Sequence, residues 1–105
     1  MKKQLLLLLL VSLFMTSSSF AYTILGTRTC GDLLSSDRDN NKITELVVGV
    51  WMQGYITARN YELSREVDHI DVDSLYYAVI KFCRDNPLQD NDDAAIHIYS
   101  NLEFK

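Results

Sequence analysis

The sequence predicts a small, single-domain, all-α protein with one disulfide bond. Three segments, near residues 42–59, 73–85 and 92–103, carry apolar residues at helical spacing, and no strand-like alternation reaches a comparable length. The chain has two cysteines, Cys30 and Cys83, which allow only one pairing within the chain. We therefore expect a bundle of three main helices, preceded by a short N-terminal helical turn.

The first 21 residues have the features of a cleavable export signal. Lys2 and Lys3 form a basic start, and residues 5–15 are an almost unbroken apolar run, shorter than the roughly 20 residues of a membrane-spanning helix. Small residues at positions 19 and 21 predict cleavage after Ala21. We expect a periplasmic domain over residues 22–105 with no membrane association. An uncleaved anchor is the alternative.

An exported chain with two cysteines favours a bond between Cys30 and Cys83. Two free thiols, or a bond between two chains, are the alternatives. Closing the loop from residue 30 to residue 83 would contribute about 4 kcal/mol by the chain-entropy model, as an upper figure. Because so small a domain has a thin core, this bond would supply much of its net stability.

The expected mature domain is acidic. Without Lys2 and Lys3 it has eight Lys and Arg side chains against 14 Asp and Glu, a net charge of −6 at neutral pH. That sign opposes binding to nucleic acid or to an anionic membrane surface. The expected partners are therefore proteins: unfolded periplasmic proteins, a single protein partner, or a second copy in a homodimer.

Helix boundaries are marked by residues typical of caps. Thr29 precedes the short N-terminal turn, Asn41 precedes residues 42–59, and either Asp71 or Asp73 precedes the next helix. Pro87 ends that helix at about residue 85, because proline lacks an N–H group and restricts the residue before it. Residues 35–41 and 60–70 are expected to form connections.

Each expected helix has an apolar stripe that should face the core. On the longest helix the stripe contains Ile43, Leu46, Val47, Val50, Trp51, Gly54 and Ala58. On the other elements the inward residues are Leu33 and Leu34; Leu75, Tyr76, Val79, Phe82 and Cys83; and Ala95, Ile98, Tyr99 and Leu102.

Three further apolar residues, Val48, Met52 and Tyr55, widen the stripe of residues 42–59 beyond one core face. We expect them, together with Trp51, to form a surface that binds a partner or client. An ordinary half-exposed helix face is an equally good explanation. Gly54 is expected to let another helix or a ring approach closely.

The residue pattern offers no catalytic, metal or cofactor site. His69 and His97 are far apart and lack a neighbouring Cys or His at zinc-ligand spacing. The aspartates at 90, 92 and 93 lack the turn glycine and the distal glutamate of a calcium loop, so we interpret them as helix-capping charge. We expect a binding protein, not an enzyme.

Three motifs occur in order after the expected signal: T-C-x-x-L-L from Thr29, W-x-x-G-Y from Trp51, and V-I-x-F-C-x-x-N-P from Val79. Together they resemble the HdeA/HdeB family of small periplasmic acid-stress chaperones over about residues 29–95. The resemblance implies an all-α fold with one disulfide, a dimer at neutral pH, and acid-triggered release of a client-binding surface.

The segment from Leu88 to Lys105 departs from this family, whose members tend to have a lysine-rich C-terminal segment, because its one lysine is the last residue. The W-x-x-G-Y-I motif followed by C-x-x-N-P also resembles small periplasmic immunity proteins that neutralise amidase toxins delivered by type VI secretion. A relative with neither role is a third alternative.

Overall fold

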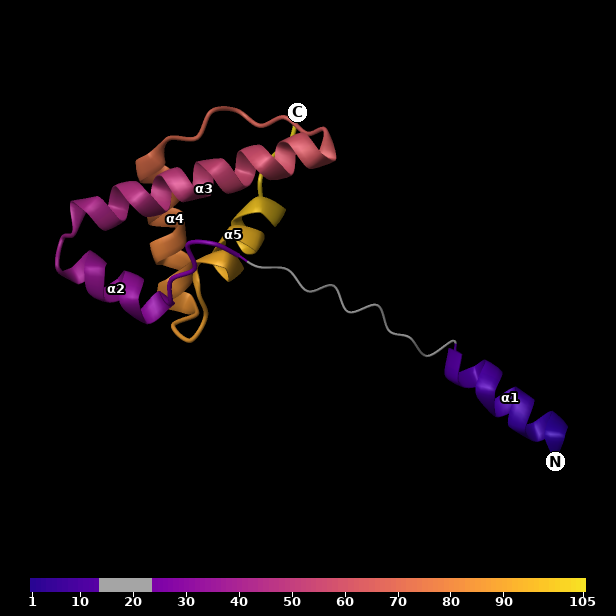
Figure 1. Ribbon diagram of the computed structural model, residues 1–105. Coiled ribbons are helices and arrows are strands. Elements are labelled where there is room, and N and C mark those ends of the chain that lie inside the picture. Colours follow the sequence, from indigo (N-terminus) through magenta and orange to yellow (C-terminus); the bar gives the residue numbers. More distant parts are fainter. Residues whose placement is uncertain (14–23) are drawn as a thin grey trace.

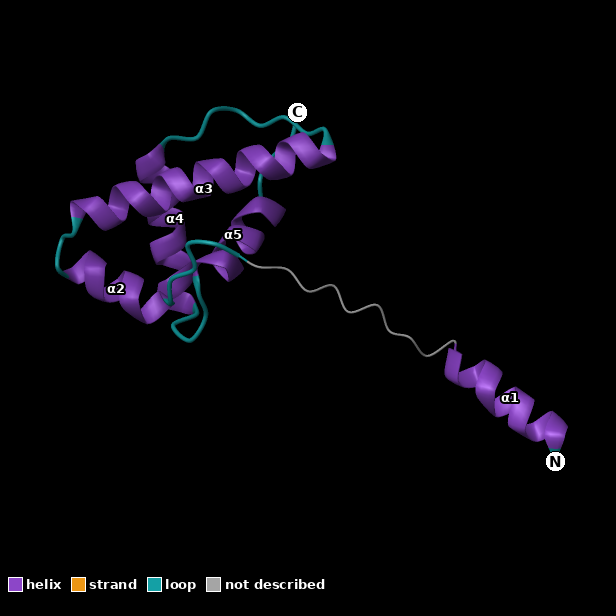
Figure 2. Cartoon of the chain, in the orientation of Figure 1, coloured by secondary structure: helices purple, strands orange, loops and turns teal. Residues whose placement is uncertain are grey.

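The structure, a computed structural model, describes residues 1–13 and 24–105. These residues form five helices and no strand (Figures 1 and 2), which confirms the all-α prediction. The helices are α1 (Lys2–Leu13), α2 (Cys30–Arg38), α3 (Lys42–Leu63), α4 (Val72–Asp85) and α5 (Asn91–Ser100). The count differs from the expected three main helices and one turn, because α2 is a complete helix and the apolar run near the N-terminus is helical.

Helix α1 covers much of the apolar run that we interpret as an export signal. It stands apart from the other helices in Figure 1, and its leucines from Leu5 to Leu10 are exposed. None of the described helices is long and apolar enough to cross a membrane. The expected cleavage point after Ala21 lies outside the described residues.

Helix α4 is the centre of the domain, since it packs against α2, α3 and α5. Its predicted core stripe is confirmed: the buried residues are Leu75, Tyr76, Val79, Ile80, Phe82 and Cys83. Cys83 is bonded to Cys30, with a Cα–Cα distance of 5.0 Å, and neither residue is exposed to solvent. The predicted disulfide is therefore present and joins the start of α2 to the end of α4.

The N-caps predicted at Thr29 and Asn41 are confirmed, Asp71 is the cap of the two aspartates considered for α4, and one of the aspartates expected at the start of α5 is its cap. In each case a side-chain oxygen of the cap accepts from a backbone N–H three residues on, which satisfies a donor that the helix leaves free. The caps are Thr29, Asn41, Asp71 and Asp90. At α5 the side chain of Asp93 also accepts from the N–H of Asp90, which completes a capping box.

Helices α2 and α3 extend into segments that the sequence suggested were loops. The last turn of α2 is fixed to α4 by Asp37, whose carboxylate accepts from the Tyr76 hydroxyl at 2.8 Å and pairs with Arg84 at 3.3 Å. Helix α3 continues to Leu63 and ends at Ser64, which has a left-handed φ of 51°. Tertiary contacts therefore outweigh the polar composition of these turns.

The lead-in before α2 is fixed to the start of α5. The backbone N–H of Cys30 donates to the Gln89 carbonyl at 2.8 Å, and that of Asn91 donates to Arg28 at 3.0 Å. The buried Asn91 side chain also accepts from the Arg28 N–H at 2.7 Å and donates to the Gly26 carbonyl at 3.1 Å. Asn91 thus satisfies backbone groups that would otherwise be buried unpaired, a role that no motif in the sequence indicated.

The start of α4 lies close against α3 at Gly49. A Cβ added there would lie 2.5 Å from the Val72 carbonyl oxygen and still closer to Val72 Cγ1. At Gly54 an added Cβ would meet nothing within 4 Å. The expected close approach at Gly54 is therefore wrong in the folded domain, and Gly49 is the glycine that the packing requires.

Candidate binding surfaces

The inward face of α3 is not the one that the sequence suggested. Val48 and Met52, which we expected on a binding surface, are 2% and 0% exposed and belong to the core, as does Ile56. The correction has a physical cause: two stripes of α3 are apolar, and the approach of Val72 to Gly49 selects the stripe beside Gly49 as the inner one. In the folded domain Val48 and Met52 cannot contact a partner.

The other apolar stripe of α3 therefore faces solvent. Ile43, Leu46, Val47 and Val50 are 76%, 57%, 54% and 50% exposed. Their spacing of i, i+3, i+4 and i+7 makes them neighbours on one side of the helix. We call these four residues the α3 face. A contiguous aliphatic surface of this kind is typical of sites that bind another protein.

Trp51 and Tyr55 lie between the core and solvent, each more than half buried. The Trp51 indole N–H donates to the Leu25 carbonyl at 2.9 Å, and its ring stacks on Tyr55 with centroids 5.9 Å apart. Trp51 is thus buried as predicted, and the lead-in supplies its hydrogen bond.

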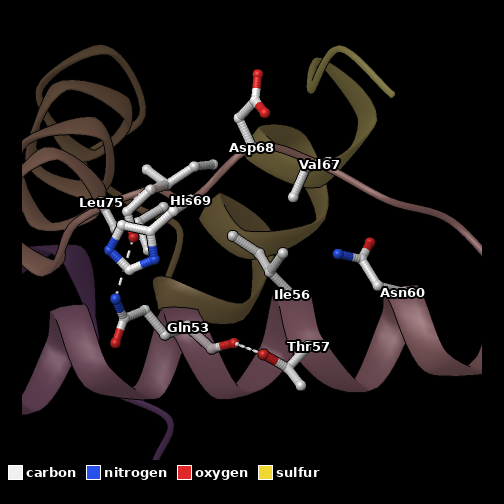
Figure 3. A pocket seen from close by; sticks show the side chains of 9 residues that line it. Gln53, Ile56, Thr57, Asn60, Val67, Asp68, His69 and Leu75 are labelled. Carbon is white, nitrogen blue, oxygen red and sulfur yellow. Dashed lines mark hydrogen bonds between the residues drawn. The ribbon is translucent and has the colours of Figure 1, made fainter. Parts of the chain in front are cut away.

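A hollow between α3 and the connection to α4 is shown in Figure 3. It measures about 360 Å³ and is lined by residues that include Ile56 and Val67, which point into it from opposite sides. Two of its polar side chains are hydrogen-bonded: Gln53 donates to the Ile70 carbonyl at 3.0 Å, and the Thr57 hydroxyl donates to the Gln53 carbonyl at 2.7 Å. The first bond attaches the connection to α3 and the second lies within α3, and neither prepares a nucleophile or an acid–base pair.

The two histidines lie in different places. His69 is exposed at the rim of the hollow in Figure 3, and His97 is exposed on α5 with its ring centroid 5.3 Å from that of Phe82. Among the described residues, the one group of three acidic, His or Cys side chains close enough to share an ion is Asp90, Asp92 and Asp93. The capping box accounts for two of these carboxylates.

The carboxylates at the helix starts have opposing pKa shifts. Backbone hydrogen bonding from Ser74 lowers the pKa of Asp71. A hydrogen bond with Asp92 lowers the pKa of Asp90, and the same bond, together with burial, raises the pKa of Asp92 to about 6. Asp90 and Asp92 therefore share one proton as a pair in mild acid.

These shifts predict a stability maximum in mild acid. Because the folded state holds the Asp92 proton more tightly than the unfolded chain, the free energy of unfolding should rise as the pH falls from about 7 to about 5. Asp71 and Asp90 act in the opposite direction, so stability should fall below about pH 4, as their folded pKa values are passed. Urea unfolding at a series of pH values measures both limbs.

In Asp92→Asn, the rise in the free energy of unfolding between about pH 7 and pH 5 should disappear, and the fall below about pH 4 should remain. Asp73→Asn is the matched control, because Asp73 also lies in the first turn of a helix. This control variant should show both the rise and the fall in the free energy of unfolding. A free energy of unfolding that declines steadily from pH 7 to pH 3 in the unaltered protein would contradict the assignment.

In comparisons with protein-family models, with curated proteins and with solved structures, nothing matches this chain.

Proposed function

We propose that the mature chain is a periplasmic protein-binding domain that acts as an acid-stress holdase. The observation that carries the proposal is the α3 face, four aliphatic side chains exposed on a folded helix. Unfolded proteins expose apolar segments of the kind that such a surface covers. The export features of residues 1–21, the disulfide and the resemblance to the HdeA/HdeB chaperones support the location and the role.

Acid would act on this domain through its carboxylates. Below about pH 3 most carboxyl groups are neutral, so the mature chain moves from −6 towards the +10 of its eight Lys and Arg and two His side chains. Protonation also weakens the contacts of Asp37 with α4 and the caps at Asp71 and Asp90. Repulsion between the positive charges then loosens the packing of the helices, so apolar core residues become exposed in addition to the α3 face. The disulfide limits this opening.

The test is aggregation of periplasmic proteins at pH 2 to 3, and after neutralisation, followed by light scattering. The unaltered protein should suppress scattering at equimolar or higher amounts. Leu46→Ser with Val50→Ser should need roughly thirtyfold more protein for the same effect, since each substitution removes an aliphatic contact worth about 1 kcal/mol. Both side chains are exposed, so folding at neutral pH should be preserved.

Leu88→Ser is the matched control, because Leu88 is 99% exposed but lies in the loop between α4 and α5. It should protect as well as the unaltered protein. The holdase proposal fails if scattering is unchanged with an equimolar amount of the unaltered protein. Equal protection by the double variant would show instead that the α3 face is not the client-binding surface.

A second candidate function is neutralisation of a secreted amidase toxin. It is favoured by the α3 face being exposed in the folded domain, where no acid is needed to present it to a partner. The net charge of −6 would speed association with a basic partner. A tight complex at neutral pH with an amidase encoded beside this gene, weakened by Leu46→Ser with Val50→Ser, would support this function. The absence of such a complex would exclude it.

A further inference from the structure

The connection between α3 and α4 covers part of the core. We call residues 64–71 the lid; it runs from the left-handed Ser64 that ends α3 to Asp71, the cap of α4. Most of the lid is exposed, but the side chains of Val67 and Ile70 are partly buried and pack against the core. The lid is therefore attached through two side chains and a few polar contacts, without secondary structure of its own.

Two buried aliphatic side chains line the hollow beneath the lid. They are Ile56 of α3 and Leu75 of α4, and Val67 of the lid lines the same hollow. In Figure 3, Val67 points from the lid toward the hollow that Ile56 enters from α3. An outward movement of the lid would open the hollow to solvent and uncover both buried side chains.

A segment distant in the sequence holds the lid near its α3 end. Residues 102–105, which we call the clasp, follow α5 and lie beside the end of α3 in Figure 1. The backbone N–H of Lys105 donates to the Glu66 carbonyl at 2.9 Å. The Lys105 ammonium also pairs with the carboxylate of Asp68 at 2.6 Å. The clasp thus bonds to both the backbone and a side chain of the lid.

Phe104 connects the clasp to the core and to the lid at once. Its ring centroid lies 5.3 Å from that of Tyr99, which is buried, and 4.6 Å from the guanidinium carbon of Arg65 in the lid. These two ring contacts together outweigh the ion pair of Lys105 with Asp68, because both side chains of that pair are mostly exposed. Closure of the lid therefore depends mainly on Phe104.

The lid is attached less firmly than the core. Its α4 end is held by the Gln53 side chain, which donates to the Ile70 carbonyl at 3.0 Å. By contrast, the core is continuous and includes the fully buried bond between Cys30 and Cys83. Segments with few buried apolar contacts open at a lower free energy than the core of the same protein.

We propose that the lid opens as a unit while the disulfide-bonded core stays folded, and that Phe104 sets the population of the open state. Opening would turn the closed hollow into an accessible apolar site that contains Ile56 and Leu75. This conformational device does not depend on the α3 face, on acid or on binding of a client.

Limited digestion of the purified, disulfide-bonded protein with trypsin at neutral pH measures the opening, because Arg65 lies in the lid. When opening is fast, the rate of cleavage follows the population of the open state. Cleavage after Arg65 leaves two pieces joined by the bond between Cys30 and Cys83, so they separate only after reduction. Phe104→Ala should raise the rate of this cleavage roughly tenfold, since it removes both ring contacts.

Asp68→Asn is the matched control, because it removes the exposed ion pair and keeps the ring contacts. It should change the rate by less than about twofold. Phe104→Leu keeps an apolar side chain without a ring and should give a rate between those of the unaltered protein and Phe104→Ala. Gln53→Ala removes the attachment at the other end of the lid and should raise the rate about fivefold.

Cleavage within α4, after Lys81 and Arg84, distinguishes opening of the lid from unfolding of the whole domain. These sites should stay resistant in Phe104→Ala, and circular dichroism should show an unchanged helix content. The proposal is wrong if Phe104→Ala speeds cleavage at Lys81, Arg84 and Arg65 by the same factor. It is also wrong if cleavage after Arg65 keeps its rate in Phe104→Ala, or if Asp68→Asn speeds that cleavage as much as Phe104→Ala does.

Discussion

Replacing both cysteines, Cys30→Ser with Cys83→Ser, should lower the free energy of unfolding by about 4 kcal/mol or more. The bond spans 53 positions, so its loss restores considerable entropy to the unfolded chain. Both sulfur positions are fully buried, and two buried hydroxyl groups add a further cost. Urea unfolding of the double variant and the oxidised protein at neutral pH measures the change.

The reduced, unaltered protein is the matched control for this experiment. It has lost the covalent bond but carries thiols, which tolerate burial better than hydroxyl groups. It should therefore be more stable than the double variant and less stable than the oxidised protein. In the acid aggregation assay the double variant should protect poorly, because nothing limits its opening. Equal protection by the double variant would contradict the proposed role of the disulfide.

Gly49→Ala should destabilise the domain by about 3 kcal/mol, at the upper end of overpacking effects. The added methyl group meets the backbone of Val72, which cannot move without shifting the start of α4 away from α3. Thermal and urea unfolding both report the loss. The variant should also expose core area, detected as increased binding of an apolar dye at neutral pH.

Gly54→Ala on the same helix is the control, and its effect should have the opposite sign. Nothing lies within 4 Å of the added Cβ, so the better helix propensity of alanine should raise stability by about 0.5–1 kcal/mol. If both glycine substitutions destabilised the domain equally, Gly49 would not be the contact that sets the spacing of α3 and α4.

The sequence predicted features that depend on nearby residues. A cap such as Asn41 or Asp71 bonds to an N–H three positions away, so its chemistry is visible in a short window. The stripe of α4 was also predictable, because the rest of that helix is polar and charged and only one side could face inward. The cysteine pairing followed from there being two cysteines.

The buried face of α3 and the lengths of two helices depend on distant residues. Two stripes of α3 have the same period and similar hydrophobicity, so periodicity could not show which one meets α4. The signal lay in Gly49, whose missing side chain only matters beside Val72, 23 positions later. The last turn of α2 likewise depends on Tyr76 and Arg84 of α4.

Because α3 is apolar on two faces, α4 has two places where it can dock first during folding. The α3 face offers four exposed aliphatic side chains, and an added Cβ at Gly54 on the same helix would meet nothing within 4 Å. If α4 docked first on the α3 face, the misassembled intermediate would have to come apart before the chain reached its native arrangement. Oxidation reduces this search, because a bond between Cys30 and Cys83 brings α2 and α4 to α3 as one unit. We therefore expect the disulfide to increase the speed and fidelity of folding, in addition to the stability of the folded domain.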